Sequence, residues 1–172
     1  MSDIEILETV FDPPLCGFLL ANARRALAEG HEFTRSNLQW DEEIRQSSAL
    51  VMVRDYDRIL SDLIIDHLLA TGTIGHREYH VMNYAWTRLS FIPWHNDGQR
   101  PEAITIYLND LWEVDWGGLF LFRDDHDEVR SVTPRFNCGV KNRGHVLHST
   151  TPVSIDAPEP RLTIQLFAVP PS

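Results

Sequence analysis

The sequence predicts a mainly β domain that is braced by helices near its N-terminus. Between residues 12 and 70, apolar side chains recur at helical spacing, whereas from about Glu78 onward the chain breaks into short β-rich runs separated by turn residues. Short strands at this spacing favour an antiparallel sandwich or barrel. The length of 172 residues suits one domain. We expect residues 1–78 to form mostly helical support and residues 79–170 to form the β core.

Two helices are expected in the N-terminal part. The first begins with Asp12 as its N-cap, carries two prolines in its first turn, and runs to about Glu29, with Gly30 at its C-terminal cap. A broad apolar stripe predicts the second helix over residues 49–70. The polar residues 34–48 between them have little periodicity and predict a loop, a candidate border of a substrate site.

Eight strands are expected in the second half. They cover residues 79–84, 87–91, 103–108, 119–122, 129–132, 137–141, 145–149 and 161–169. In the last of them Arg161, Thr163, Gln165 and Phe167 share one face, and the intervening residues on the other face are all apolar. A polar inner face suits a barrel whose interior holds a charged small molecule.

Composition excludes several classes of protein and partner. The formal net charge is −10 and no basic run is present, so we expect no nucleic-acid partner. The two cysteines have no paired spacing, which argues against a disulfide framework or a thiolate zinc site. No signal-like or membrane-length apolar segment is present, which predicts a cytoplasmic protein without a membrane partner. The oligomeric state is left open.

Three residues form a candidate metal site. His95 and Asp97 are two positions apart, so on a strand both side chains would point to the same face. His148 is the most plausible third ligand. Two histidines and one carboxylate leave three positions free on an octahedral Fe(II), as in non-haem iron oxygenases. Thirteen residues further on, the planar fork of Arg161 suits a carboxylate such as the distal one of 2-oxoglutarate.

The order of these signals resembles the prolyl-hydroxylase-like branch of the Fe(II)/2-oxoglutarate dioxygenases. The resemblance rests on Tyr84, His95-Asn96-Asp97, Ile106-Tyr107-Leu108-Asn109, Trp112, Gly117-Gly118, His148 four residues before Pro152, and Arg161. It implies a double-stranded β-helix, or jelly-roll, core. It also implies Fe(II), 2-oxoglutarate and O₂, with ascorbate as a candidate reductant.

The resemblance also assigns roles around the cosubstrate. Tyr107 and Arg161 would bind the carboxylate of 2-oxoglutarate, and Tyr84 would be a pocket tyrosine. Thr163 could add a hydroxyl donor from the same strand face as Arg161. The implied reaction is hydroxylation of an unactivated C–H with release of succinate and CO₂. A prolyl residue is the first substrate expectation, and a free proline-like amino acid or small metabolite is the next. A carboxylate at Asp97 argues against halogenation, because no ligand position is vacated for halide.

Several alternatives stay open from the sequence. His145 is three residues before His148, so only one of the two can enter the site, and the spacing to Pro152 resembles the family motif for His148. His126 and Glu128 form a rival pair, although five consecutive polar residues there are typical of a hairpin loop. A non-catalytic jelly-roll binding protein, a cupin-type metalloenzyme that does not use 2-oxoglutarate, and a nucleic-acid repair enzyme are the rival functions.

Overall fold

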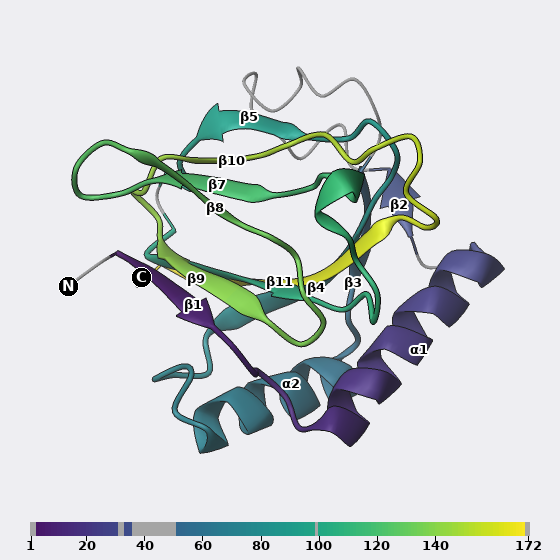
Figure 1. Cartoon of the computed structure of the whole chain (residues 1–172). Helices are drawn as coiled ribbons and strands as arrows, with labels where there is room; N and C mark the ends of the chain where they lie inside the picture. The colour runs from purple at the N-terminus through teal and green to yellow at the C-terminus, as the bar shows by residue number, and fades with distance from the viewer. Residues whose placement is uncertain (1–2, 31–32, 36–50, 99, 171–172) are drawn as a thin grey trace.

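The computed structural model describes residues 3–30, 33–35, 51–98 and 100–170 (Figure 1). In chain order the elements are β1 (Ile4–Leu7), α1 (Pro13–Glu29), β2 (Thr34–Arg35), β3 (Val51–Asp55), α2 (Arg58–Ala70), β4 (Tyr79–Trp86), β5 (Ile92–His95), β6 (Glu102–Tyr107), the 3₁₀ turn η2 (Val114–Trp116), β7 (Phe120–Arg123), β8 (Val129–Val132), β9 (Gly139–Arg143), β10 (His148–Thr150) and β11 (Arg161–Ala168).

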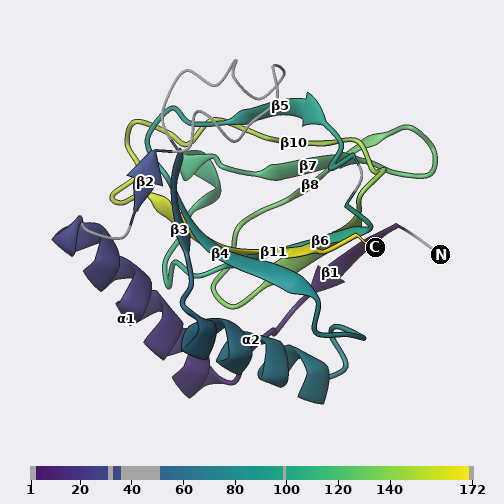
Figure 2. The same cartoon turned by 180° about the vertical axis from the view of Figure 1, so that it is seen from behind.

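The strands form two antiparallel sheets that face each other. The major sheet has seven strands in the order β1-β9-β6-β11-β4-β3-β2, and the minor sheet has four in the order β5-β10-β7-β8. Figures 1 and 2 show the minor sheet above the major one, with both helices on the far side of the major sheet. This is the jelly-roll architecture with helical support that the sequence predicted.

Strand β11 determines which residues face the interior. It lies between β4 and β6, and its residues alternate between the two faces of the major sheet. Leu162, Ile164 and Leu166 pack in the same core as the buried faces of α1 and α2. Arg161 and Gln165 line a cavity between the sheets. The predicted division into a polar inner face and an apolar outer face is therefore confirmed.

Helix α1 has the predicted boundaries. Asp12 is its N-cap and accepts a hydrogen bond from the amide of Leu15 at 3.1 Å. Gly30 ends the helix in the left-handed conformation, with φ of 67°, which a glycine adopts without steric cost. No helix in the described part of the chain is both long and apolar enough to cross a membrane.

The prediction of one helix over residues 49–70 is wrong. Residues Val51–Asp55 form strand β3, which pairs with β4, and α2 begins only at Arg58. Two buried valines alternate along β3, where β-branched side chains pack well on a pleated surface. Asp57 then caps the helix. The apolar residues of β3 and α2 fit one helical period in the sequence although they belong to two elements. Ile59 fits that period as well, yet it is 80% exposed.

The strand predicted over residues 87–91 is also wrong. The amide of Ser90 donates to the carbonyl of Thr87 at 3.0 Å, and Leu89 has a φ of 68°, so the chain turns here. Strand β5 starts afterwards, at Ile92. Leu89, one of the two apolar residues of this segment, is 49% exposed, and residues 87–91 are part of no strand.

Two other segments differ from the expectation. Of the loop expected over residues 34–48, Thr34–Arg35 form β2, and the remainder lies outside the described residues. The strand expected over residues 145–149 begins only at His148, because the amide of Val146 donates to the carbonyl of Arg143 and closes a turn. The N-terminal part thus contributes β1, β2 and β3 to the major sheet in addition to its helices.

Candidate active site

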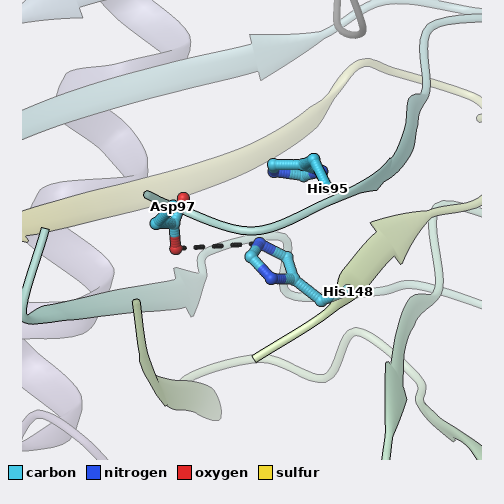
Figure 3. Close-up of side chains that lie close together, drawn as sticks. All are labelled: His95, Asp97 and His148. Atoms are coloured by element: carbon cyan, nitrogen blue, oxygen red, sulfur yellow. Dashed lines mark ion pairs between the residues drawn. The ribbon is translucent and has the colours of Figure 1, made fainter. Parts of the chain in front are cut away.

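Two histidines lie side by side on neighbouring strands of the minor sheet. His95 is the last residue of β5, His148 is the first of β10, and the two are register partners. Their ring centroids are 4.3 Å apart. Both side chains are buried, although each histidine lies at the end of its strand. Figure 3 shows both rings directed toward the same point as Asp97.

Backbone carbonyls select the tautomer of both rings. His95 Nδ1 lies 2.8 Å from the carbonyl oxygen of Pro93, and His148 Nδ1 lies 2.8 Å from that of Val146. A carbonyl can only accept, so each Nδ1 carries the hydrogen and each Nε2 presents a lone pair. This hydrogen bonding is the usual support of a histidine that binds a metal.

Asp97 completes the cluster from the segment after β5. The ligand atoms of His95, Asp97 and His148 all lie within 4.8 Å of one another, and Asp97 Oδ2 is 3.7 Å from His148 Nε2. Because β5 ends at His95, strand alternation is not what brings the first two residues together. Instead, the amide of Asp97 donates to the carbonyl of Gly144 at 2.8 Å, which bends the chain back to the site.

Asn142 orients the carboxylate of Asp97. Its Nδ2 donates to Asp97 Oδ2 at 2.9 Å from strand β9 of the major sheet, whereas Asp97 follows β5 of the minor sheet. Asn142 is itself buried, so its position is determined by the sheet. Asn142 was not predicted as a site residue from the sequence. Asn142 lies within β9, and no local sequence motif distinguishes it from other polar strand residues.

Burial keeps His148 neutral. Desolvation is the main reason that its pKa is lowered below the usual value, and the nearby His95 lowers it further, while the charge of Asp97 opposes the change. A neutral imidazole is the form that binds a metal.

Arg161 is a buried cation without an acidic partner among the described residues. Its side chain is only 2% exposed, and desolvation lowers its pKa to about 10. Its Nη1 donates to the carbonyl of Gly118, while its Nε has no hydrogen-bond partner. The buried hydroxyl of Tyr107 also lacks a partner, and burial raises its pKa to about 12. Unpaired buried donors are costly, so this end of the cavity suits an anionic ligand with several oxygen atoms.

Gly118 makes room for Arg161. A Cβ at position 118 would lie 2.9 Å from Arg161 Cδ, and the φ of 65° disfavours other residues. At Gly117, a Cβ would lie 2.2 Å from the carbonyl oxygen of Pro152. Both glycines have a positive φ, which lets the chain turn here, and Gly118 also allows the close approach of Arg161.

One cavity joins the histidine cluster to the arginine. Its open space measures about 490 Å³, part of which is continuous with solvent. His95, Asp97, His148, Tyr107 and Arg161 all line it. The three residues predicted to bind metal therefore line the same cavity as Arg161, Tyr107 and Tyr84, three of the four predicted to bind cosubstrate.

Tyr84 and Thr163 differ in whether they reach the cavity. Tyr84 lines the cavity from β4, and burial raises its pKa. Thr163 is on the same face of β11 as Arg161 but does not line the cavity, and its oxygen accepts hydrogen bonds from Trp86 and Gln165. Trp86 was not singled out in the sequence. Two residues after Tyr84 on one strand, it could have been found by alternation.

The rival histidines lie elsewhere. His145 is 70% exposed and pairs with Asp3 at 3.0 Å on the surface. His126 and Glu128 are in the exposed hairpin loop between β7 and β8, where Glu128 pairs with Arg130. Neither joins the cluster.

A protein-family model decides the family. The model described as the 2OG-Fe(II) oxygenase superfamily matches residues 78–169, more than half of the chain. The chain belongs to this superfamily. No curated protein matches the sequence of this oxygenase significantly.

Solved structures support the same fold. The oxygenase is similar to a Pseudomonas putida prolyl-4-hydroxylase, with a TM-score of 0.77 and 18% identity over 98% of this chain and 93% of that one. It is also similar to a Trichoplax adhaerens prolyl hydroxylase solved with a hypoxia inducible factor peptide fragment, with a TM-score of 0.70 and 17% identity over 96% and 83% of the chains. A third structure, the α-ketoglutarate-dependent epimerase SnoN from nogalamycin biosynthesis, has a TM-score of 0.68 and 18% identity over 98% and 78%.

Proposed function

We propose that this protein is an Fe(II)- and 2-oxoglutarate-dependent hydroxylase. The observation that carries the proposal is the single cavity that holds His95, Asp97 and His148 on one side and the unpartnered donors of Arg161 and Tyr107 on another. Membership of the 2OG-Fe(II) oxygenase superfamily supports the choice of metal and cosubstrate.

The three clustered side chains would hold the iron. The Nε2 atoms of both histidines are free to bind because each Nδ1 hydrogen is engaged by a carbonyl. Asp97 would supply the negative charge, oriented by Asn142. Bound iron and 2-oxoglutarate would supply the oxidation of an unactivated C–H by O₂, with conversion of 2-oxoglutarate to succinate and CO₂.

Arg161 and Tyr107 would bind the distal carboxylate of 2-oxoglutarate. A carboxylate at this position would compensate the buried guanidinium and accept the Tyr107 hydroxyl hydrogen. Burial of both groups excludes water, so the cosubstrate would be oriented before the substrate arrives. Tyr84 lines the same cavity from β4 and would be a further pocket residue for the cosubstrate.

We infer that the substrate is a prolyl residue or a free proline-like amino acid. Two of the structural relatives are described as prolyl hydroxylases, but their identity to this chain is low and a third is described as an epimerase. A proline-containing peptide and free L-proline are therefore the first substrates to compare.

An anaerobic titration tests the cofactor assignment. Fe(II) and then 2-oxoglutarate are added to the metal-free protein while the visible charge-transfer band of the chelate is followed. We expect a band in the wild type and in His145→Ala, no band in His95→Ala, and a band in Arg161→Ala only at much higher 2-oxoglutarate. Iron binding without a band in the wild type would favour a cupin-type metalloenzyme, and absence of iron binding would favour a non-catalytic binding protein.

Succinate release tests the substrate. We expect the peptide or L-proline to increase succinate formation and to gain one oxygen atom by mass. If neither compound does so while the band forms normally, the prolyl assignment is wrong and the oxygenase assignment stands.

A further inference from the structure

Trp86 lies directly against the guanidinium of Arg161. The two residues are register partners on β4 and β11, and Arg161 Cζ is 4.6 Å from the centroid of the indole ring. Trp86 is almost fully buried. A cation over the face of an indole is attracted by the ring quadrupole, so the indole favours one placement of the planar fork.

Thr163 in turn holds the indole. Trp86 Nε1 donates to Thr163 Oγ1 at 3.1 Å, and Gln165 Nε2 donates to the same oxygen at 3.2 Å. Thr105 Oγ1 donates to Gln165 Oε1 at 2.8 Å. These bonds form a chain across β6, β11 and β4 along the cavity wall, since Thr105, Gln165 and Trp86 all line the cavity. Thr163 itself is fully buried and does not line the cavity.

We propose that Thr163 is a positioning residue that acts on the cosubstrate through Trp86 and Arg161. In this arrangement the threonine oxygen fixes the indole, and the indole face keeps the guanidinium directed at the carboxylate. Thr163 makes no direct contact with 2-oxoglutarate. The proposal rests on the proposed function, because it concerns the affinity of the same cavity for the cosubstrate.

Removing the hydroxyl of Thr163 would remove the oxygen that accepts the indole N–H at 3.1 Å. Valine has the shape of threonine but no oxygen, so the indole would lose this contact with β11 and the placement that the contact favours. Serine keeps the oxygen. Replacing Trp86 by phenylalanine keeps an aromatic face and removes the N–H, so in that background Thr163 has no indole left to hold.

A double-mutant cycle distinguishes indirect from direct action. The dissociation constant of 2-oxoglutarate is measured from the charge-transfer band, anaerobically with Fe(II), for wild type, Thr163→Val, Trp86→Phe and the double variant. We expect Thr163→Val to raise the constant about 10-fold, and to raise it little further when Trp86 is already phenylalanine. Thr163→Val removes the acceptor of Gln165 Nε2 in both backgrounds, so the cost of that lost hydrogen bond cancels when the two effects are compared. Equal effects of Thr163→Val in both backgrounds would overturn the proposal and favour direct contact.

Two variants control for loss of structure. Thr163→Ser should bind 2-oxoglutarate nearly as the wild type does, and an equally weak Thr163→Ser would overturn the role of the hydroxyl. Thr71→Val removes a threonine hydroxyl that bonds the His67 carbonyl at the end of α2, away from the cavity. It should leave the dissociation constant unchanged. A wild type that forms no band would overturn the proposed function and this inference together.

The indole N–H can also be observed without any cofactor. Five tryptophans give five indole signals in a ¹⁵N–¹H spectrum, and the signal of Trp86 is assigned by its loss in Trp86→Phe. We expect that signal to shift and to exchange faster with solvent in Thr163→Val, but to stay in place in Thr163→Ser. An unchanged Trp86 signal in Thr163→Val would contradict the proposed contact.

Discussion

His95 and His148 are register partners whose Nδ1 atoms are each hydrogen-bonded to the carbonyl two residues earlier in the chain. The two strand ends therefore orient both rings in the same way, with both Nε2 atoms directed toward one point. Backbone carbonyls provide this orientation, so it uses no other side chain of the cavity wall.

Asn142→Ala is expected to weaken iron binding. The change removes the hydrogen bond that orients Asp97, and loss of such a contact around a metal site costs about 10- to 100-fold in metal affinity. The affinity is measured by competition with a chelator of known strength. Asn83→Ala removes a buried asparagine that bonds the Thr163 carbonyl on the other face of the sheet. If Asn83→Ala weakens iron binding equally, orientation of Asp97 is not the cause.

Arg161→Met is expected to stabilise the ligand-free protein while abolishing its response to 2-oxoglutarate. Burial lowers the pKa of Arg161, so the charged form is disfavoured in the folded state and no described acid compensates it. Replacing an uncompensated buried charge by an apolar side chain is worth roughly 1–3 kcal/mol. Thermal unfolding with and without 2-oxoglutarate measures both effects. A lower melting temperature of Arg161→Met without ligand would mean that the contacts with Trp86 and Gly118 outweigh the burial cost.

Gly118→Ala is expected to weaken 2-oxoglutarate binding more than its effect on stability explains. The new Cβ would clash with Arg161 Cδ, and the positive φ adds about 1–2 kcal/mol of strain. Gly72 is a matched control, because its φ of 74° is similar and its Cβ would meet no atom within 4 Å. Gly72→Ala should lose stability without losing affinity. Equal affinities in the two variants would show that the close approach of Arg161 is not needed.

Asn109→Ala is expected to destabilise the fold by about 1–3 kcal/mol. Asn109 Oδ1 accepts from the amide of Leu162 at 2.7 Å, and its Nδ2 donates to Glu159 and to the carbonyl of Pro160, so one buried side chain holds the start of β11. Asp110→Ala removes an exposed ion pair with Arg24 and the hydrogen bonds of the same exposed carboxylate to the backbone of residues 110 and 111, and it should cost less than about 1 kcal/mol. Denaturant unfolding of the two variants provides the comparison.

Local patterns in the sequence were sufficient for part of this structure. Residues close together in the chain predict the capped helix α1 and the two faces of β11. Motif spacing selects His95, Asp97, His148 and Arg161 as candidate site residues. The failures concern contacts between distant segments. Strand β3 was read as helix because its pairing with β4 is not visible in its own five residues.

The supporting residues of the site were harder to foresee for the same reason. Asn142 meets Asp97 across 45 residues, and Trp86 meets Thr163 across 77. Neither pair has a recognisable spacing. The first contact depends on how the two sheets face each other, and the second depends on the register of β4 and β11. Thr163 was correctly placed on the face of Arg161, but which partner its hydroxyl would find depended on a tryptophan from another strand.

The central place of β11 in the major sheet has a consequence for how the protein is made. β4 and β6 both pair with β11. Neither strand is therefore paired on both sides until β11 has left the ribosome. Nascent chains that stop before residue 161 would expose two unpaired strand edges, which are prone to aggregation. Synthesis of Arg161 and completion of the sheet thus coincide, so a chain that lacks the one also lacks the other.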